Sequence, residues 1–538
     1  MSFQIRLLLL LFLLGEALSF GQGDDFVRGM LLDSKSGAPV VFATIRLKEK
    51  AVGVISNQDG SFRLPRRFMN LGETLTISCL GYENRHIMLS ELPLDTAVTI
   101  KLDSRPIELE EAILTGKRRR LTPRQIIKKA IDRIDQNYLV SPFSYVGYYR
   151  DYQLKDNEYV NLNEALLQIN DMGFQQNDLD HTKIRLYDYR ANSDFQRDSL
   201  ANSPYDYVTK GKIIKNAYLP GFGGNELNIL RIHDAIRNYN IKTYSYINRL
   251  NRDLIRNHSL SRKGDRIIDN ERIYVIGLEK SRPELDPDIS PGEEVHADFR
   301  SEGTIYISQS SYAIHKLVYK MFDTNIQERS KQDIAKGKDK LIFEVTVEYM
   351  KKEGKMYPNY ISFHNVFKLQ KSLFKILDIR MNKDEKCFVV KFNKAPILMI
   401  DENRKNFMVK YRKKRIRLIE TRAVFDEFHL YPEPEKFDCV FKESTAESRG
   451  AGYFSPENFE FNFIGVQDAQ GNALNDFEYE EFDQYREFFT QQIQLSLVED
   501  IPEKVLMQKN RPIFDNQPLT RPDNFDEYWM NTPLKKNQ

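Results

Sequence analysis

The stretch GVISNQDGSFRLP, residues 53–65, decides how the N-terminal part of the chain folds. It fits either a calcium loop or a turn between two strands. An EF-hand loop needs an aspartate at its first position and a glutamate at its twelfth, because several carboxylate oxygens hold the ion. Aligning the Asn-Gln-Asp-Gly run places Ile55 first and Arg66 twelfth. The calcium interpretation fails on both ligands. The Asp-Gly pair instead predicts the turn of a β-hairpin, since glycine reaches positive φ freely.

The segments around this turn have the pattern of strands. Apolar and polar residues alternate over residues 41–48, 74–79 and 98–102, which is the period of a half-buried strand. Glycines recur between these segments, at positions 37, 53, 60, 72 and 81. Short strands separated by glycine turns predict a small β-sandwich.

Residues 25–103 also carry a set of short motifs in a fixed order. They are Val27-x-Gly29, Asp33, Gly37-x-Pro39, Ala43-Thr44-Ile45, Gly53, Asn57-x-Asp59-Gly60-x-Phe62-x-Leu64, Leu75-x-Ile77-Ser78 and Gly81-Tyr82. With these motifs the segment resembles the carboxypeptidase regulatory-like domain. The resemblance implies a transthyretin-like sandwich without catalytic residues. It also implies a relation to proteins of Bacteroidota, in which this domain precedes many TonB-dependent receptors and other outer-membrane proteins.

The N-terminus predicts export. Arg6 precedes an apolar run from Leu7 to Leu14, and the small residues Ser19 and Gly21 follow. This is the layout of a secretory signal peptide over residues 1–21, and the run is too short to span a bilayer. We therefore expect an exported protein, and the resemblance above implies a periplasmic location in association with the outer membrane. The 79 basic and 77 acidic residues nearly cancel, which argues against nucleic acid as a partner.

A basic linker, residues 104–121, leads to a predicted helix. Thr122 and Gln125 form a capping box, and Pro123 suits the first turn. Apolar residues from Ile126 to Tyr138 recur at helical spacing. The basic residues of segment 117–129 either contact anionic lipid, as a peripheral membrane contact, or an acidic partner, or they form a solvated face.

The remainder predicts an α+β domain over residues 122–400, with a mostly antiparallel sheet. Strands are expected at Tyr145–Leu154 and Tyr159–Ile169, where the sequence resembles uncharacterised exported proteins of Bacteroidota. Residues 220–262 have helical spacing, and strands dominate from Arg266 onward. The stretch GTIYISQSSYAIHKL, residues 303–317, resembles the sheet of periplasmic proteins that cradle lipoprotein acyl chains.

Residues 401–538 are expected to form a C-terminal extension with an irregular, proline-containing tail. The chain's one tryptophan, Trp529, lies in this tail. It either anchors the tail in a core groove or forms an exposed aromatic hook for a partner. Cys387 and Cys439 either form a disulfide or remain free thiols.

The sequence offers no motif of a known catalytic site. His-x-x-Glu, His-Glu-x-x-His, Gly-x-Ser-x-Gly and Cys-x-x-Cys are all absent, and LPGFGG at 219–224 lacks the lysine of a phosphate loop. His296 with Glu293, Glu294 and Asp298 is the best metal-like cluster, but its loop context favours solvated side chains. We therefore predict no catalytic, cofactor-binding or metal residue.

These observations favour a mainly β protein with an α+β remainder. It is expected to be a non-enzymatic interaction, scaffold or binding module of the cell envelope. Its partner is expected to be an outer-membrane protein or an envelope polymer. A periplasmic carrier of a lipid or apolar ligand is the first alternative, and a hydrolase with an unrecognised site is the second.

Overall fold

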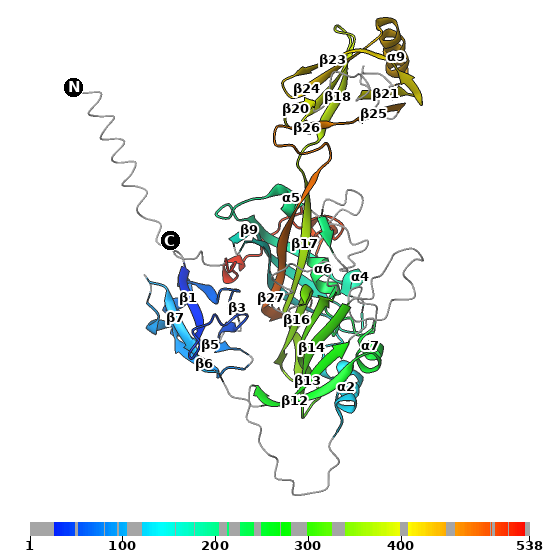
Figure 1. Cartoon of the computed structure of the whole chain (residues 1–538). Coiled ribbons are helices and arrows are strands. Elements are labelled where there is room, and N and C mark those ends of the chain that lie inside the picture. The colour runs from blue at the N-terminus through cyan, green and yellow to red at the C-terminus, as the bar shows by residue number, and fades with distance from the viewer. Residues whose placement is uncertain are drawn as a thin grey trace, which may run out of the picture. The chain divides into compact units, whose positions relative to one another are not determined.

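The computed structural model is mostly β-strand, and two compact units divide the chain (Figure 1). Unit one is Met1–Tyr205, Ile214–Phe367 and Phe482–Gln538; unit two is Asp206–Ile213 and Lys368–Glu481. Among the described residues, no helix is long and apolar enough to cross a membrane. The structure describes residues 26–48, 52–79, 81–93, 96–104, 121–156, 158–176, 178–203, 212–214, 226–240, 249–268, 271–280, 299–324, 339–398, 407–447, 458–494, 497, 501–514 and 516–532.

The N-terminal part of unit one is a β-sandwich, as the alternating segments predict. Its buried apolar residues come from both sheets, including Leu31, Ile45 and Phe62. One sheet has the order β4-β1-β7, formed by Ser61–Pro65, Phe26–Asp33 and Val98–Leu102. The other has the order β3-β2-β5-β6, formed by Gly53–Ile55, Thr44–Leu47, Thr74–Ser78 and Arg85–Met88.

The predicted hairpin at Asp59-Gly60 is wrong, although the turn is there. Gly60 has φ 79° and donates its N–H to the Asn57 carbonyl at 2.8 Å. The flanking strands do not pair with each other, because β3 pairs with β2 and β4 pairs with β1. The turn is a corner between the two sheets. The Leu31 N–H of β1 donates to the Gly60 carbonyl at 2.8 Å, which holds the end of this corner on the sheet that contains β1 and β4.

The larger part of unit one is an 11-stranded sheet in which strands far apart in the sequence are neighbours. The strand β27 (Phe477–Gln494) lies between β8 (Phe143–Lys155) and β17 (Lys355–Ser372). The predicted C-terminal extension therefore supplies a central strand of this sheet. The path is β10-β9-β8-β27-β17-β16-β15-β14-β13-β12, and β11 (Lys212–Ile214) pairs with β17. The bounds, in that order, are Lys183–Ala191, Glu158–Asp171, Phe143–Lys155, Phe477–Gln494, Lys355–Ser372, Lys340–Lys352, Ile314–Asp323, Phe299–Ser308, Glu271–Lys280 and Ser259–Ile268.

Helices pack on one face of this sheet. The predicted capping box is present in α2 (Pro123–Asp132), where the Gln125 N–H donates to the Thr122 hydroxyl at 3.3 Å. The apolar residues of α2 lie in one core with those of α6 (Glu226–Ile232) and α7 (Leu250–Arg256). The described residues of this unit also contain the short α-helices α3 (Ile134–Asn137), α4 (Asp178–His181) and α5 (Ser199–Asn202). Four 3-10 helices are present as well, η1 (Arg66–Leu71), η2 (Leu89–Glu91), η6 (Glu503–Val505) and η7 (Phe525–Glu527).

The helical prediction for residues 220–262 holds only in part. Two short helices are present in the described residues, but from Ser259 the chain forms β12. That segment pairs with β13 from Ser259↔Glu279 to Ile268↔Glu271. Pairing with a neighbouring strand therefore overrides the local helical pattern.

The longer segment of unit two is Lys368–Glu481, so it crosses the expected boundary at 400–401. Its core joins Phe388 and Phe392 with Phe428, so residues on both sides of position 400 share one interior. The strands form a sheet β18-β19-β24-β23 (Ile376–Asn382, Cys387–Phe392, Glu427–Pro432, Leu418–Val424), a sheet β22-β21-β25 (Lys414–Ile416, Phe407–Tyr411, Phe459–Phe463) and a pair β20-β26 (Pro396–Leu398, Val466–Asp468), with α9 at Pro434–Glu447. Cys387 is buried, Cys439 is exposed, and both are free thiols.

Candidate functional site

The face of the large sheet opposite the helices carries a buried ion pair. Arg150 of β8 and Glu487 of β27 are directly opposite in the strand register, and their side chains are 1% and 3% exposed. The guanidinium approaches the carboxylate with Nη2–Oε2 at 2.5 Å and Nε–Oε2 at 2.7 Å. The Tyr152 hydroxyl donates to the other carboxylate oxygen at 2.8 Å. Burial alone would lower the pKa of Arg150, but the Glu487 carboxylate raises it well above its ordinary value.

The sandwich and the C-terminal tail both reach this ion pair. Arg150 Nη1 donates to the side-chain oxygen of Asn57, in the corner turn, and to the carbonyl of Asn531, in the tail, at 3.3 Å. The Asn531 amide donates in turn to the Ile55 carbonyl at 2.7 Å. Three segments far apart in the sequence therefore meet at one buried guanidinium. We call Arg150, Glu487, Asn57 and Asn531 the junction.

A second arginine ties the sandwich to the sheet. Arg46 of β2 donates to the Asn359 side chain at 2.8 Å and to the Thr490 carbonyl at 3.0 Å, and its guanidinium lies 5.0 Å from the Phe489 ring centroid. Burial lowers the pKa of Arg46 to about 10, and the Glu348 carboxylate opposes that shift. The arginine thus contacts both strands β17 and β27.

The tail is fixed to the sandwich by Trp529, as the anchoring interpretation predicts. The indole is 3% exposed and belongs to the sandwich core, with its ring centroid 5.4 Å from that of Phe68. Its Nε1–H donates to the Arg63 carbonyl at 3.0 Å, and its carbonyl accepts from Gln491 at 2.8 Å. An indole that is both buried and hydrogen-bonded is a strong anchor.

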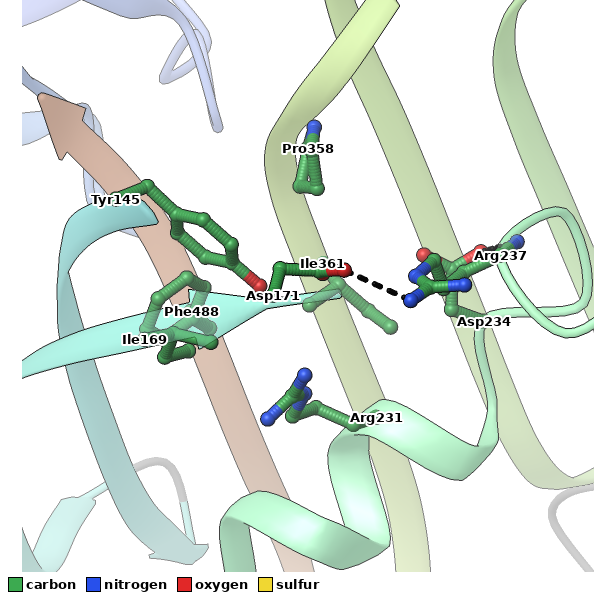
Figure 2. A pocket seen from close by; sticks show the side chains of 9 residues that line it. All are labelled: Tyr145, Ile169, Asp171, Arg231, Asp234, Arg237, Pro358, Ile361 and Phe488. Atoms are coloured by element: carbon green, nitrogen blue, oxygen red, sulfur yellow. Dashed lines mark hydrogen bonds and ion pairs between the residues drawn. The ribbon is translucent and has the colours of Figure 1, made fainter. Parts of the chain in front are cut away.

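A small cavity lies on the helix side of the sheet (Figure 2). Its volume is about 30 Å³, which is room for about two water molecules. The Asp171 carboxylate at its wall accepts from Arg237 at 2.8 Å, the contact drawn in Figure 2. The Tyr349 hydroxyl donates to Asp234 at 2.5 Å, and burial with this carboxylate raises the tyrosine pKa. The lining residues are Tyr145, Ile169, Asp171, Arg231, Asp234, Arg237, Pro358, Ile361 and Phe488.

Residues 303–317, which resemble the sheet of proteins that cradle acyl chains, form parts of β14 and β15. Its apolar residues Ile305, Ile307 and Leu317 are fully buried in the core that also contains α2. In the described residues, this apolar face is therefore covered by a helix of the same chain.

The basic residues of segment 117–129 are described only from 121 onward. Arg124 donates to the Ile255 carbonyl at 2.9 Å, Lys128 pairs with Asp132 at 2.7 Å, and Lys129 lies 5.0 Å from the Tyr312 ring centroid. These three side chains have partners within the chain. Residues 117–120, the LPGFGG turn and the cluster at 293–298 lie outside the described residues.

The sequence carried only a weak signal for the junction. Arg150 stands in the run SYVGYYRDYQ, where a charged residue interrupts a strand of aromatic residues. A charge in such a strand predicts a buried partner. The partner is Glu487, 337 positions later in the chain, and no local pattern identifies it.

A family comparison agrees with the geometry of the sandwich. Residues 27–114 match the model of the CarboxypepD_reg-like domain. This confirms the predicted resemblance, and we call the sandwich the regulatory-like domain below. No curated protein matches the chain.

Solved structures resemble the chain only distantly. A LolA superfamily protein from Nitrosomonas europaea is 12% identical, with a TM-score of 0.19, and the match covers 46% of this chain and 86% of that one. A putative outer-membrane lipoprotein-sorting protein domain from Vibrio parahaemolyticus is 11% identical, with a TM-score of 0.21 and coverages of 44% and 84%. A DUF1329 family protein from Desulfovibrio piger is 8% identical, with a TM-score of 0.20 and coverages of 46% and 87%. At these values the likeness carries no functional argument.

Proposed function

We propose that this chain is an exported, non-enzymatic scaffold of the bacterial envelope that binds a partner at the outer membrane. The junction is the observation that supports this proposal. Its charged and amide side chains hold the regulatory-like domain, the large sheet and the tail together, so they act as structural groups rather than on a substrate. The regulatory-like domain, the large sheet and the tail, when held together by these contacts, would form a rigid scaffold to which a partner can bind.

Unit two offers the side chains that would contact the partner. It contains more than half of the exposed large apolar side chains of the described residues. Phe425, in the turn between β23 and β24, is 91% exposed, and the neighbouring Val424 is 37% exposed. Apolar side chains gathered on a surface mark a binding site more often than isolated ones do.

The cellular location rests on the N-terminal part of the chain. The signal-peptide pattern of residues 1–21 favours export, and the regulatory-like domain precedes outer-membrane proteins in Bacteroidota. We infer that the partner is an outer-membrane protein or an envelope polymer, and that nucleic acid is not a partner.

A carrier of a lipid or apolar ligand is the competing function. Its support is the apolar face of the large sheet beneath the helices. The cavity at that face measures about 30 Å³, whereas pockets for drug-sized ligands measure roughly 300–1,000 Å³. A carrier would therefore have to open between the sheet and α6. Native mass spectrometry of protein purified from its own envelope would reveal a retained acyl-containing ligand and so favour the carrier.

Photocrosslinking in cells tests the scaffold proposal. A photoreactive amino acid replaces Phe425 in one variant and Leu200 in a control, because Leu200 is an apolar residue of unit one that is 56% exposed. We expect one dominant envelope partner crosslinked at position 425 and none at position 200. Equal patterns at both positions, or none at either, would contradict the proposal. A hydrolase activity that a point mutation abolishes would overturn it.

A further inference from the structure

Three side chains that commonly bind metals converge at one sheet of unit two, where Cys387 is buried, His429 is half-buried and Glu385 is exposed. Glu385 lies in the turn between β18 and β19, Cys387 is the first residue of β19, and His429 lies on the adjacent strand β24. One potential ligand atom from each lies within 4.8 Å of the others. A carboxylate, a thiol and an imidazole from two neighbouring strands form a mixed donor set.

The spacing of these atoms fits a tetrahedral ion. His429 Nδ1 is 3.2 Å from Glu385 Oε2, and Cys387 Sγ is 3.8 Å from the same oxygen. Ligand atoms around tetrahedral Zn²⁺ lie roughly 3.3–3.6 Å apart, given bonds of about 2.0–2.3 Å to nitrogen, oxygen and sulfur. The two distances to Glu385 are close to this range, and the thiol and imidazole ligand atoms lie within 4.8 Å of each other. Rotation of the Cys387 and His429 side chains by up to about an ångström would place all three atoms on one ion.

The imidazole is also held as a metal-binding histidine is. Its other nitrogen, Nε2, lies 3.3 Å from Glu427 Oε2, and the other oxygen of Glu427 accepts from Arg380 at 2.8 Å. A carboxylate that orients the far side of a ligand histidine fixes the tautomer and raises ligand basicity. The arginine in turn holds the Glu427 carboxylate in place. The ring orientation leaves Nδ1 facing Glu385.

Tyr431 lies beside the same carboxylate, and its hydroxyl donates to Glu385 at 3.2 Å. Cys387 is buried and Glu385 is exposed. A cation held by this sulfur would take the place of the thiol proton.

We propose that Glu385, Cys387 and His429 form a site for a thiolate-preferring divalent cation, with Zn²⁺ as the physiological class of ion. Three protein ligands leave a fourth position for water or for a group from a partner. Thiolate and imidazole favour zinc over magnesium or calcium, which prefer oxygen ligands. The site does not depend on the proposed function. The alternative is a hydrogen-bonded network that only stabilises the sheet.

Metal titration of the chelator-treated whole chain tests the site. We expect about one Zn²⁺ per chain by equilibrium dialysis, and with Co²⁺ a thiolate-to-metal charge-transfer band in the near ultraviolet. Cys387→Ser should abolish that band. Cys439→Ser is the matched control, because Cys439 is an exposed free thiol of the same unit, and it should bind as the wild type does.

Two further variants test the site even if Cys387→Ser, which changes a buried residue, unfolds the sheet. Glu385→Gln replaces an exposed ligand and should weaken Zn²⁺ binding by more than 100-fold, while circular dichroism stays unchanged. Glu427→Gln should weaken it by about 10–100-fold, as expected for a group that orients a ligand. The proposal is overturned if the chain binds no Zn²⁺, or if binding is equal in the Glu385→Gln and Cys439→Ser variants.

Discussion

Replacing Arg150 by methionine should loosen the regulatory-like domain and the tail from the large sheet. The substitution keeps an apolar side chain in the space but leaves the Glu487 carboxylate, 3% exposed, without its cation. It also removes the bonds that the guanidinium makes to Asn57 and to Asn531. All three parts of unit one lose a shared contact at once.

The magnitude follows from the burial of the pair. Breaking a buried ion pair by removing one partner costs about 3–5 kcal/mol, because a desolvated charge is left unpaired. The bonds to Asn57 and Asn531 add about 1 kcal/mol each. Unit one should therefore lose about 5–7 kcal/mol of its free energy of unfolding. Replacing Glu487 by glutamine as well removes the orphaned charge while Tyr152 keeps an acceptor, so the double variant should recover about half of the loss.

The tryptophan supplies the assay. Trp529 is the chain's one tryptophan and is buried in the sandwich core, so its emission reports directly on tail docking during urea unfolding. Arg150→Met should shift the midpoint strongly to lower urea and expose the indole to acrylamide quenching. Arg262→Met is the control, because Arg262 and Asp265 form a surface pair whose side chains are 33% and 41% exposed, and such pairs contribute under about 1 kcal/mol.

Two results would refute this reasoning. One is a midpoint for Arg150→Met that equals that of the Arg262→Met control. The other is a double variant, with Glu487→Gln, that is no more stable than Arg150→Met alone. In either case the buried pair would not hold the junction together.

Three other substitutions test separate parts of unit one. Trp529→Ala should destabilise the regulatory-like domain by about 3–5 kcal/mol, seen as faster proteolysis of the sandwich and a lower melting temperature by circular dichroism. Gly147→Ala should cost about 1–3 kcal/mol, because its new Cβ would lie 2.0 Å from Phe488 Cζ; the urea midpoint measures this, and an unchanged midpoint would contradict it. Burial, with the charge of Asp151, raises the Glu226 pKa to about 7, above its unfolded value, so the native state loses stability as pH rises from about 4.5 to 7. Glu226→Gln should therefore melt at a higher temperature than the wild type at pH 8 but not at pH 4, with a gain of up to about 3 kcal/mol.

Local patterns in the sequence determined the elements that depend on local physics. Alternation of apolar and polar residues predicts the sandwich strands. The strands at Tyr145–Leu154 and Tyr159–Ile169, expected from the resemblance to exported proteins, correspond to β8 and β9. The capping box of Thr122 and Gln125 forms where it is expected. The sandwich strands and the helix cap can be predicted from the sequence, because a strand period or a helix cap involves residues only a few positions apart.

Only the tertiary structure decided which strands pair and which polar groups meet. The turn at Asp59-Gly60 is visible in the sequence, yet whether it joins paired strands or two sheets depends on contacts with β1 and β2. Arg150 contacts Glu487 because β27 pairs with β8 and places the two residues opposite each other. Strands that are far apart in the sequence can pair and bury side chains together. No local pattern in the sequence therefore identifies which strands will pair. The sequence alone therefore predicts the individual strands and helices. The contacts of the junction form only when segments far apart in the sequence are buried together.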